Sequence, residues 1–280
     1  MKKFLFAILA VLAVGAAFAT GVDLNHITSA GISLMGIPAV IDTEHSRVVS
    51  DRINALFGDL NFLVQPAYIR SENVISNTKN SYSFETRSDR LANITGRPLQ
   101  KGVDNNDLFF VSDWGLYLDN RVTTSKSQVV LQTFPNSIAF AAATTGCTYA
   151  QLDIFYNSSI QFQVGSTVWY EAYDTQRFRY VPQTQQTAAT TAAAGNYSQA
   201  SLKDTLVPIA PYAVLSGSAS NIIQLNIPAL PDTADMAVDT GTQPTGENVL
   251  TLYFNGFVIK NGADNPVIAK RLLDNKINLK

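Results

Sequence analysis

The chain is poor in the side chains on which most enzyme chemistry and most disulfide scaffolds depend. Its 280 residues include one cysteine and two histidines. The lone Cys147 excludes an internal disulfide, and we interpret it as a small apolar side chain. His26 and His45 both precede the β-rich part of the chain, and no Gly-x-Ser-x-Gly elbow or phosphate loop is present. We predict a non-enzymatic protein with no catalytic, cofactor-binding or metal-binding residues.

Charged residues are also scarce. They make up 15% of the chain, against about 25% in a typical soluble domain, whereas hydrophobic residues make up 46%. The 20 basic residues are scattered and the formal net charge is −2, so the sequence lacks the basic footprint of a nucleic-acid-binding protein. This composition favours a protein that covers part of its surface with other subunits or with a membrane.

The first 19 residues form an uncharged run behind a short basic start. Lys2 and Lys3 precede the stretch from Phe4 to Ala19, which ends in the small-x-small spacing of a secretory cleavage site. The run is somewhat short for a membrane span, which needs about 20 apolar residues. Two alternatives stay open, a signal removed after Ala19 and a retained helix that contacts a membrane.

Few segments follow a helical pattern. Residues 21–41 have no clear period and are interpreted as an extended arm. A helix is predicted from Thr43 to Phe57, capped by Asp42 or Thr43, with an apolar face made of Val49, Ile53 and Leu56. A short closing helix is predicted from Val267 to Leu273, behind Pro266.

Most of the chain has the pattern of β-strands. The clearest case begins at Ser159, where Ile160, Phe162 and Val164 alternate with glutamines, Gly165 and Ser166 can turn the chain, and Thr167 to Tyr173 returns as the second strand of a hairpin. Further strands are predicted at Phe62–Ile69 (an edge strand containing Pro66), Tyr82–Thr86, Leu108–Leu118, Gln128–Phe134, Ser137–Ala141, Arg177–Val181, Ala213–Leu215, Ile222–Ile227 and Val249–Ile259.

About eight strong strands with few helices indicate an all-β sandwich, and eight is the number in one jelly roll. A double jelly roll needs roughly twice as many strands, and that alternative stays open. In the longest strand, we expect Gly115 to mark a bulge and one parity to form the core face, namely Leu108, Phe110, Trp114, Leu116 and Leu118.

Three parts are predicted along the chain: an apolar segment at 1–19, an arm and helix at 20–60, and a β body at 61–280. Residues 183–201 hold no Val, Ile, Leu or charged residue, and residues 228–248 are acidic and rich in Pro and Gly. We interpret both as long exposed loops of the body.

Three groups of side chains deserve comparison with known chemistry. Two sets of acids can offer oxygen ligands to calcium without the EF-hand spacing, although solvated acids are commoner; they are Asp104 with Asp107, and Asp232 with Asp235 and Asp239. Glu85 and Glu171 are the acids on strands of mixed polarity that a glycosidase pair would use. Trp114 and Trp169 can line a carbohydrate site, but aromatic cores use the same residues.

Four segments carry a resemblance to a known family. They are NDLFFVSDWGLYL (106–118), VVLQTFPNSIAF (129–140), the hairpin running into FRYVPQTQQ (178–186), and VLTLYFNGFVIKNG (249–262). In this order they resemble jelly-roll major capsid proteins of tailless icosahedral bacteriophages with an internal membrane. The resemblance covers about half of the chain and rests on strand order, without a diagnostic motif.

The resemblance implies a virion protein that self-assembles into trimeric or pseudo-hexagonal capsomers over a lipid vesicle, with no enzymatic site. Its expected partners are copies of itself, other virion proteins and, through the N-terminal segment, the membrane. The alternative is an exported β-sandwich binding module, an adhesin or carbohydrate binder, that is secreted or periplasmic after cleavage at Ala19.

Overall fold

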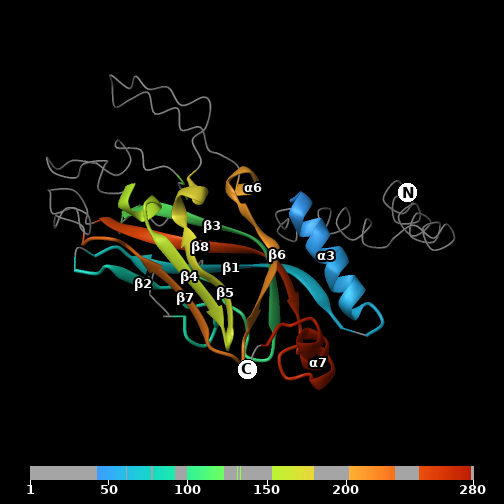
Figure 1. Cartoon of the computed structure of the whole chain (residues 1–280). Coiled ribbons are helices and arrows are strands. Elements are labelled where there is room, and N and C mark those ends of the chain that lie inside the picture. Colours follow the sequence, from blue (N-terminus) through green and yellow to red (C-terminus); the bar gives the residue numbers. More distant parts are fainter. Residues whose placement is uncertain are drawn as a thin grey trace, which may run out of the picture. The chain divides into compact units, whose positions relative to one another are not determined.

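Two four-stranded antiparallel sheets form the body of the protein in the computed structural model (Figure 1). The structure describes residues 43–60, 62–76, 78–91, 100–122, 131, 133, 153–179, 202–230 and 246–278, and all of them belong to one compact unit, 41–280. Sheet A has the strand order β1-β8-β3-β6 and sheet B the order β2-β7-β4-β5. The predicted all-β sandwich with few helices is confirmed.

The strands of sheet A are long and those of sheet B short. Sheet A contains β1 (Val64–Val74), β8 (Gly246–Ile259), β3 (Leu108–Val122) and β6 (Val207–Ser216). Sheet B contains β2 (Ser81–Ser83), β7 (Asn221–Asn226), β4 (Ser159–Val164) and β5 (Thr167–Asp174). The described helices are α3 (Glu44–Phe57), α6 (Leu202–Thr205), α7 (Pro266–Asp274) and the 3₁₀ turns η1 (Asp153–Tyr156) and η2 (Thr175–Phe178).

The strand pairs are nested. β4 pairs with β5, β3 with β6, β2 with β7, and β1 with β8, each antiparallel. Two further pairs, β3·β8 and β4·β7, join these hairpin-like pairs into the two sheets. The chain therefore runs like a long hairpin that is folded over on itself.

Three long connections attach to the same end of this sandwich, whereas the β2–β3 connection, 84–107, lies at the opposite end. Because successive strands alternate in direction, β1, β3, β5 and β7 end where β2, β4, β6 and β8 begin. The connections that start or finish there include 123–158, 175–206 and 227–245. At the opposite end, β4 and β5 are joined by the two-residue turn of Gly165 and Ser166, with Gly165 at φ 56°, as predicted for the hairpin.

The main core lies between the two sheets and is rich in aromatic rings. The predicted alternation in β4 is confirmed, because Ile160, Phe162 and Val164 are buried and the glutamines between them are not. In β8 the inward residues include Leu250, Leu252, Phe254 and Val258, and most of the residues that alternate with them are buried as well. Trp114 is fully buried at the centre, with ring centroids 4.7 Å from Tyr173 and 4.9 Å from Phe178.

The single core face predicted for the strand at 108–118 is wrong. The pairing of β3 shifts between Val111 and Asp113, so Ser112 is an extra residue, and the side-chain parity changes there. Before the bulge, Leu108 and Phe110 face a second core on the other side of sheet A; after it, the inward residues are Trp114, Leu116 and Leu118. The bulge therefore falls at Ser112 and not at the predicted Gly115.

Helix α3 covers this second core and confirms the helix predicted at 43–57. The Thr43 side chain accepts a hydrogen bond from the Ser46 amide, and the Ser46 hydroxyl completes a capping box. Its buried face includes Val49, Ile53 and Phe57, whereas the predicted Leu56 is only partly buried. α7 begins at Pro266 behind an Asn265 cap, as expected, and buries Ile268 and Leu272 in the same core.

The strand predicted at Arg177–Val181 is wrong over its first two residues. Asp174 accepts a hydrogen bond from the Gln176 amide (2.9 Å) and turns the chain into η2, which delivers Phe178 to the core. Other expectations fall outside the described residues: the segment 1–19, the arm 21–41, His26, Cys147, nearly all of 128–134, 137–141 and 183–201, and the acids at 232, 235 and 239.

Candidate functional site

A cleft of about 570 Å³ opens beside β1, which is an edge strand of sheet A. Its floor is apolar and its rim is polar and charged, with Lys101, Asp104, Asp107 and Lys260 prominent. A second hollow of about 410 Å³ shares the same acids and Lys260. The floor side chains are Ala67, Ile69, Val103, Phe109 and Val258.

The β2–β3 connection builds the cleft by lying across the edge of the sandwich. The backbones of Arg70 and Lys101 exchange two hydrogen bonds, of 2.8 and 3.0 Å. Val103 donates to the Thr86 carbonyl (2.7 Å) and accepts from the Ser88 amide (2.8 Å). Residues 101–103 thus join β1 of sheet A to the chain that follows β2 of sheet B, and they cover part of the β1 edge.

The Lys260 ammonium lies between two carboxylates on the rim. Its Nζ is 2.6 Å from Asp107 Oδ2 and 3.2 Å from Asp104 Oδ2. The other oxygen of Asp107 accepts from the Asn261 amide (2.9 Å), and that of Asp104 accepts from the Ser88 hydroxyl (2.9 Å). Asn261 has φ 55°, a conformation that asparagine tolerates well, and it directs its amide at the buried Asp107.

These contacts shift two pKa values in the directions that strengthen the pair. The hydrogen bond that Lys260 donates to the Asp107 carboxylate raises the pKa of Lys260 above its ordinary value. The hydrogen bonds from Ser88 and Lys260 lower the pKa of Asp104. Both residues stay charged at neutral pH, so this group, which we call the Lys260 clamp (Asp104, Asp107, Lys260), acts as an ionic tie between the β2–β3 connection and the end of β8.

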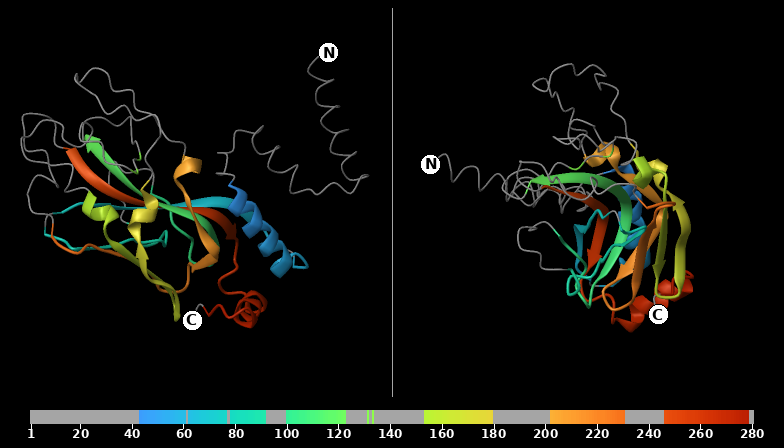
Figure 2. Two further views of the ribbon diagram at one scale, coloured as in Figure 1. Left: turned by 45° about the horizontal axis from the view of Figure 1, so that its top comes forward. Right: turned by 90° about the vertical axis from the view of Figure 1, so that its left-hand side faces the viewer.

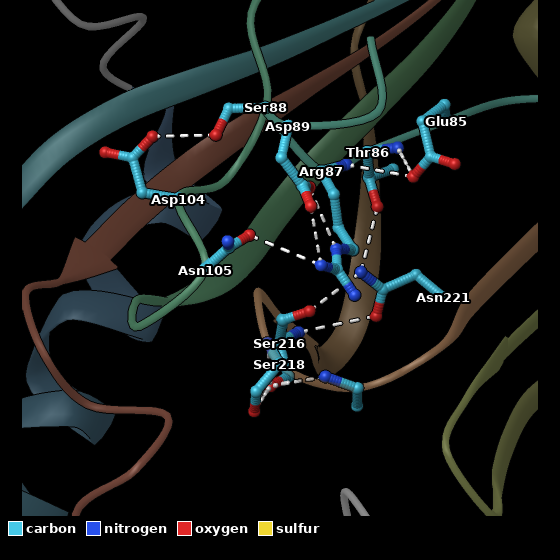
Figure 3. A network of polar contacts seen from close by, with 11 residues as sticks. Glu85, Thr86, Arg87, Ser88, Asp89, Asp104, Asn105, Ser216, Ser218 and Asn221 are labelled. Atoms are coloured by element: carbon cyan, nitrogen blue, oxygen red, sulfur yellow. Dashed lines mark hydrogen bonds and ion pairs between the residues drawn. The ribbon is translucent and has the colours of Figure 1, made fainter.

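A polar network extends from the clamp toward the β6–β7 turn (Figure 3). Arg87 makes a bidentate pair with Asp89 (3.1 and 2.8 Å) and reaches Asn105 at 3.3 Å. The side-chain amide of Asn221 donates hydrogen bonds to the Thr86 hydroxyl (3.0 Å) and to the Ser216 carbonyl (2.9 Å). The network fastens three chain segments at this end of the sandwich.

The acids considered as calcium ligands face an ammonium group. Asp104 and Asp107 come together as their spacing suggested, but Lys260 occupies the position between them. Within the described residues, no group of three or more His, Cys, Asp or Glu side chains is placed to hold a metal ion.

The two glutamates considered for sugar hydrolysis do not form a pair. Glu85 lies two residues beyond the end of β2 and accepts hydrogen bonds from the backbone amides of Thr86 and Arg87 (3.0 and 3.1 Å), while Glu171 is exposed on β5. β2 and β5 lie at opposite edges of sheet B, three strand spacings or roughly 14 Å apart. Catalytic carboxylates of glycosidases lie about 5–9.5 Å apart.

The remaining candidates have structural contacts. His45 lies 2.9 Å from the Ile209 carbonyl through Nε2, which ties α3 to β6. Trp114 is a core residue with no exposed ring, and Trp169 is half-buried on β5 beside both cores. Neither tryptophan offers an open platform for a sugar.

Sequence reasoning missed a polar group on the outward side of β1. Arg70 and Glu72 form a buried ion pair (2.7 Å), and Tyr68 stacks on Tyr253 of β8 with centroids 5.4 Å apart. Lys101 sits 4.8 Å above the Tyr68 ring. Alternation in YIRSEN places these residues on one face, but it contains no signal that the face is buried.

Comparison with known protein families, with curated proteins and with solved structures gives no match. Among the described helices, none is long and apolar enough to cross a membrane.

The clamp leads to a stability prediction. Asp107 is buried and holds both Lys260 and a backbone amide, so Asp107→Ala should lower the free energy of unfolding by roughly 1.5–3 kcal/mol. Asp104 is well exposed, so Asp104→Ala should cost less than about 1 kcal/mol. Urea unfolding of the two variants beside the natural protein measures the difference. Equal losses would show that Asp107 is not the anchoring acid.

Proposed function

We propose that the chain is a structural shell protein, a jelly-roll major capsid protein that self-assembles into a closed particle. The observation that carries the proposal is the nested pairing of β1·β8, β2·β7, β3·β6 and β4·β5 within two four-stranded sheets. Eight strands in two sheets, formed by rolling up an antiparallel hairpin, is the connectivity of a jelly roll, which viral capsid domains use. The resemblance of the four segments to phage capsid proteins points the same way.

The composition supports assembly. Only 15% of the residues are charged, so few charged side chains are available to cover the whole surface of a monomer. The cores of subunit interfaces are depleted of charged residues, so this composition suits a protein that buries part of its surface between subunits. A shell subunit has a structural role and does not need a catalytic site. The Lys260 clamp and its polar network fit such a role, because their ion pairs and hydrogen bonds connect segments of the sandwich and do not pair a nucleophile with a base.

The strand edges favour discrete contacts over fibres. β6 carries Pro208 and Pro211, β1 carries Pro66, and β2 is three residues long. The pairing of β5 with β4 contains two register shifts. Prolines, short strands and bulges all hinder the edge-to-edge pairing of sheets, so copies should meet through faces and loops.

The position of the long connections suits a shell subunit. Segments 123–158, 175–206 and 227–245 attach to one end of the sandwich, while α3 covers the other end of sheet A (Figure 1). In the proposed capsomer, one end presents loops to the exterior and the flanks of the sandwich meet neighbouring copies. The segment 1–42 is proposed to reach neighbours or the underlying membrane.

An exported β-sandwich binding module is the second candidate, and the cleft beside β1 favours it. A volume of about 570 Å³ with an apolar floor and a polar rim lies within the roughly 300–1,000 Å³ of small-molecule sites. Jelly rolls also occur in lectin domains. The two candidates differ in oligomeric state and in the fate of residues 1–19.

Intact mass and particle size, measured on protein from its native source, test the proposal. We expect the full 30.4 kDa chain in megadalton particles by light scattering and electron microscopy. A variant lacking residues 1–42 keeps Thr43 and the α3 core, so it should stay folded while assembling less completely. A monomer that has lost residues 1–19 would overturn the capsid proposal and favour the binding module.

A further inference from the structure

The outer face of sheet B is unusual for a solvated surface, because three of its four strands present no charge there. The outward side chains of β2, β7 and β4 are serine, asparagine, glutamine and isoleucine only. No strand of sheet B contains a lysine or arginine, and its two acids, Glu171 and Asp174, both lie exposed on the edge strand β5. The eight uncharged residues are Ser81, Ser83, Ser159, Gln161, Gln163, Ile222, Gln224 and Asn226.

Two exposed aliphatic side chains lie in one row of this face. Ile222 of β7 pairs with Gln163 of β4, which pairs with Val168 of β5, so all three point outward together. Val168 is 52% exposed and Ile222 37% exposed. β4 and β5, drawn in yellow, form one flank of the sandwich in the end-on view (Figure 2, right), whereas α3 and α7 pack against the second core beside sheet A.

We infer that the outer face of sheet B is a contact between two copies of this chain, packed face to face about a two-fold axis. The inference deepens the proposed function and rests on it. The outer sides of β2, β7 and β4 carry no charge and offer nothing for a charged partner to recognise. Their amide and hydroxyl side chains both donate and accept hydrogen bonds, so this part of the face is complementary to itself.

The charges on β5 select the direction of the axis. An axis across the strands would place β5 over β5 and bring the four carboxylates of two copies together. An axis along the strands, between β7 and β4, places Glu171 and Asp174 of one copy over the β2 edge of the other, where Ser81 and Ser83 present hydroxyl groups. Like charges opposite one another are unfavourable, so the second arrangement holds.

The size of the face predicts a weak contact that repetition strengthens. Four strands of about six residues cover roughly 400 Å² per copy, below the roughly 800 Å² per partner of a standard stable interface. A pair held by this face alone should therefore dissociate on dilution. Several such contacts in a shell add up through multivalency.

Charge reversal at one position tests the inference. Gln161 lies near the proposed axis and makes no side-chain hydrogen bond within the described part of the chain, so substitution there should leave the fold intact. Gln161→Lys and Gln161→Glu each place like charges across the contact and should raise the concentration for half-association at least about tenfold. An equimolar mixture of the two variants should restore association, because each pair then joins opposite charges.

Sedimentation velocity over a range of protein concentrations, at low ionic strength, gives the readout. The matched controls are Val48→Lys and Val48→Glu on α3, where Val48 is 57% exposed on the sheet A side; both should associate like the natural chain. Gln161 variants that behave like these controls would overturn the inference and leave the proposed function standing. A mixture that fails to restore association would overturn the two-fold contact. A natural chain that stays monomeric would overturn the proposed function itself.

Discussion

Gly256→Ala should destabilise the sandwich by roughly 3 kcal/mol or more. Gly256 lies in β8, between Ala67 of β1 and Val111 of β3. A β-carbon there would lie 1.9 Å from the Phe110 carbonyl oxygen and 3.1 Å from the Phe109 ring. The obstacle is backbone of the neighbouring central strand, so β3 and β8 would have to separate beside the bulge.

Chemical denaturation of Gly256→Ala measures this loss, with Gly262→Ala as the matched control. A β-carbon at Gly262 meets nothing closer than 3.2 Å, the distance to both the Cγ2 methyl group and the carbonyl oxygen of Ile259, so shifts of a few tenths of an ångström relieve the contact. The control should change the free energy of unfolding by less than about 1 kcal/mol. Similar unfolding midpoints for the two variants would mean that β3 and β8 do not approach as closely as described.

Asp113→Ala is expected to cost roughly 3 kcal/mol, because it removes a buried acceptor that three donors share. Asp113 is 2% exposed, and its Oδ2 accepts from the Thr43 hydroxyl (2.8 Å), the Ser112 hydroxyl (2.7 Å) and the Asn255 amide (3.3 Å). Thr43 also caps α3. The carboxylate thus joins the start of the helix, the β3 bulge and β8.

Two substitutions test the role of the Asp113 carboxylate. Asp113→Asn keeps an acceptor oxygen and the shape of the side chain, so it should lower the free energy of unfolding by only about half as much as Asp113→Ala. Asp264→Ala removes an exposed acid and should stay within about 0.5 kcal/mol of the natural protein. Thermal and urea unfolding measure the stability of Asp113→Ala, Asp113→Asn and Asp264→Ala. An Asp113→Ala protein as stable as Asp264→Ala would refute the role assigned to this carboxylate.

Local pattern was a reliable guide wherever a strand is regular and faces one core. In β4, each apolar residue alternates with a glutamine, and the sheet buries the apolar ones as predicted. Thr43, Ser46 and Gly58 mark the ends of α3 through contacts within a few residues of one another. Asn265 and Pro266 do the same for α7. Such signals depend on neighbours in sequence, so they can be read without the fold.

The pattern failed in β3, where two cores meet one strand. Phe109 and Phe110 are equally apolar, and only the partners decide which faces inward: the sandwich contacts Phe109, while α3 and α7 contact Phe110. The bulge at Ser112 is stabilised by Asp113 and by Asn255, which is more than 140 residues away in the sequence. No local period contains that information.

The candidate site shows the same division. The spacing of Asp104 and Asp107 predicted two carboxylates close together, which the structure bears out. Their partner, Lys260, comes from the end of β8, so sequence reasoning considered the acids only as solvated groups or as calcium ligands and left the lysine out. The cleft beside β1 depends on the backbone bridge between Arg70 and Lys101, which is also a long-range contact.

By itself, the sequence determined the β-rich class, the hairpin at 159–174, the two principal helices and the scarcity of charge, because each follows from neighbouring residues or from composition. Only the tertiary structure decided the nesting of β1·β8 around β4·β5, the change of parity in β3, the Lys260 clamp and the uncharged outer side of β2, β7 and β4. These four features arise from pairing between strands far apart in the chain, and strand alternation specifies two faces without saying what will cover either of them.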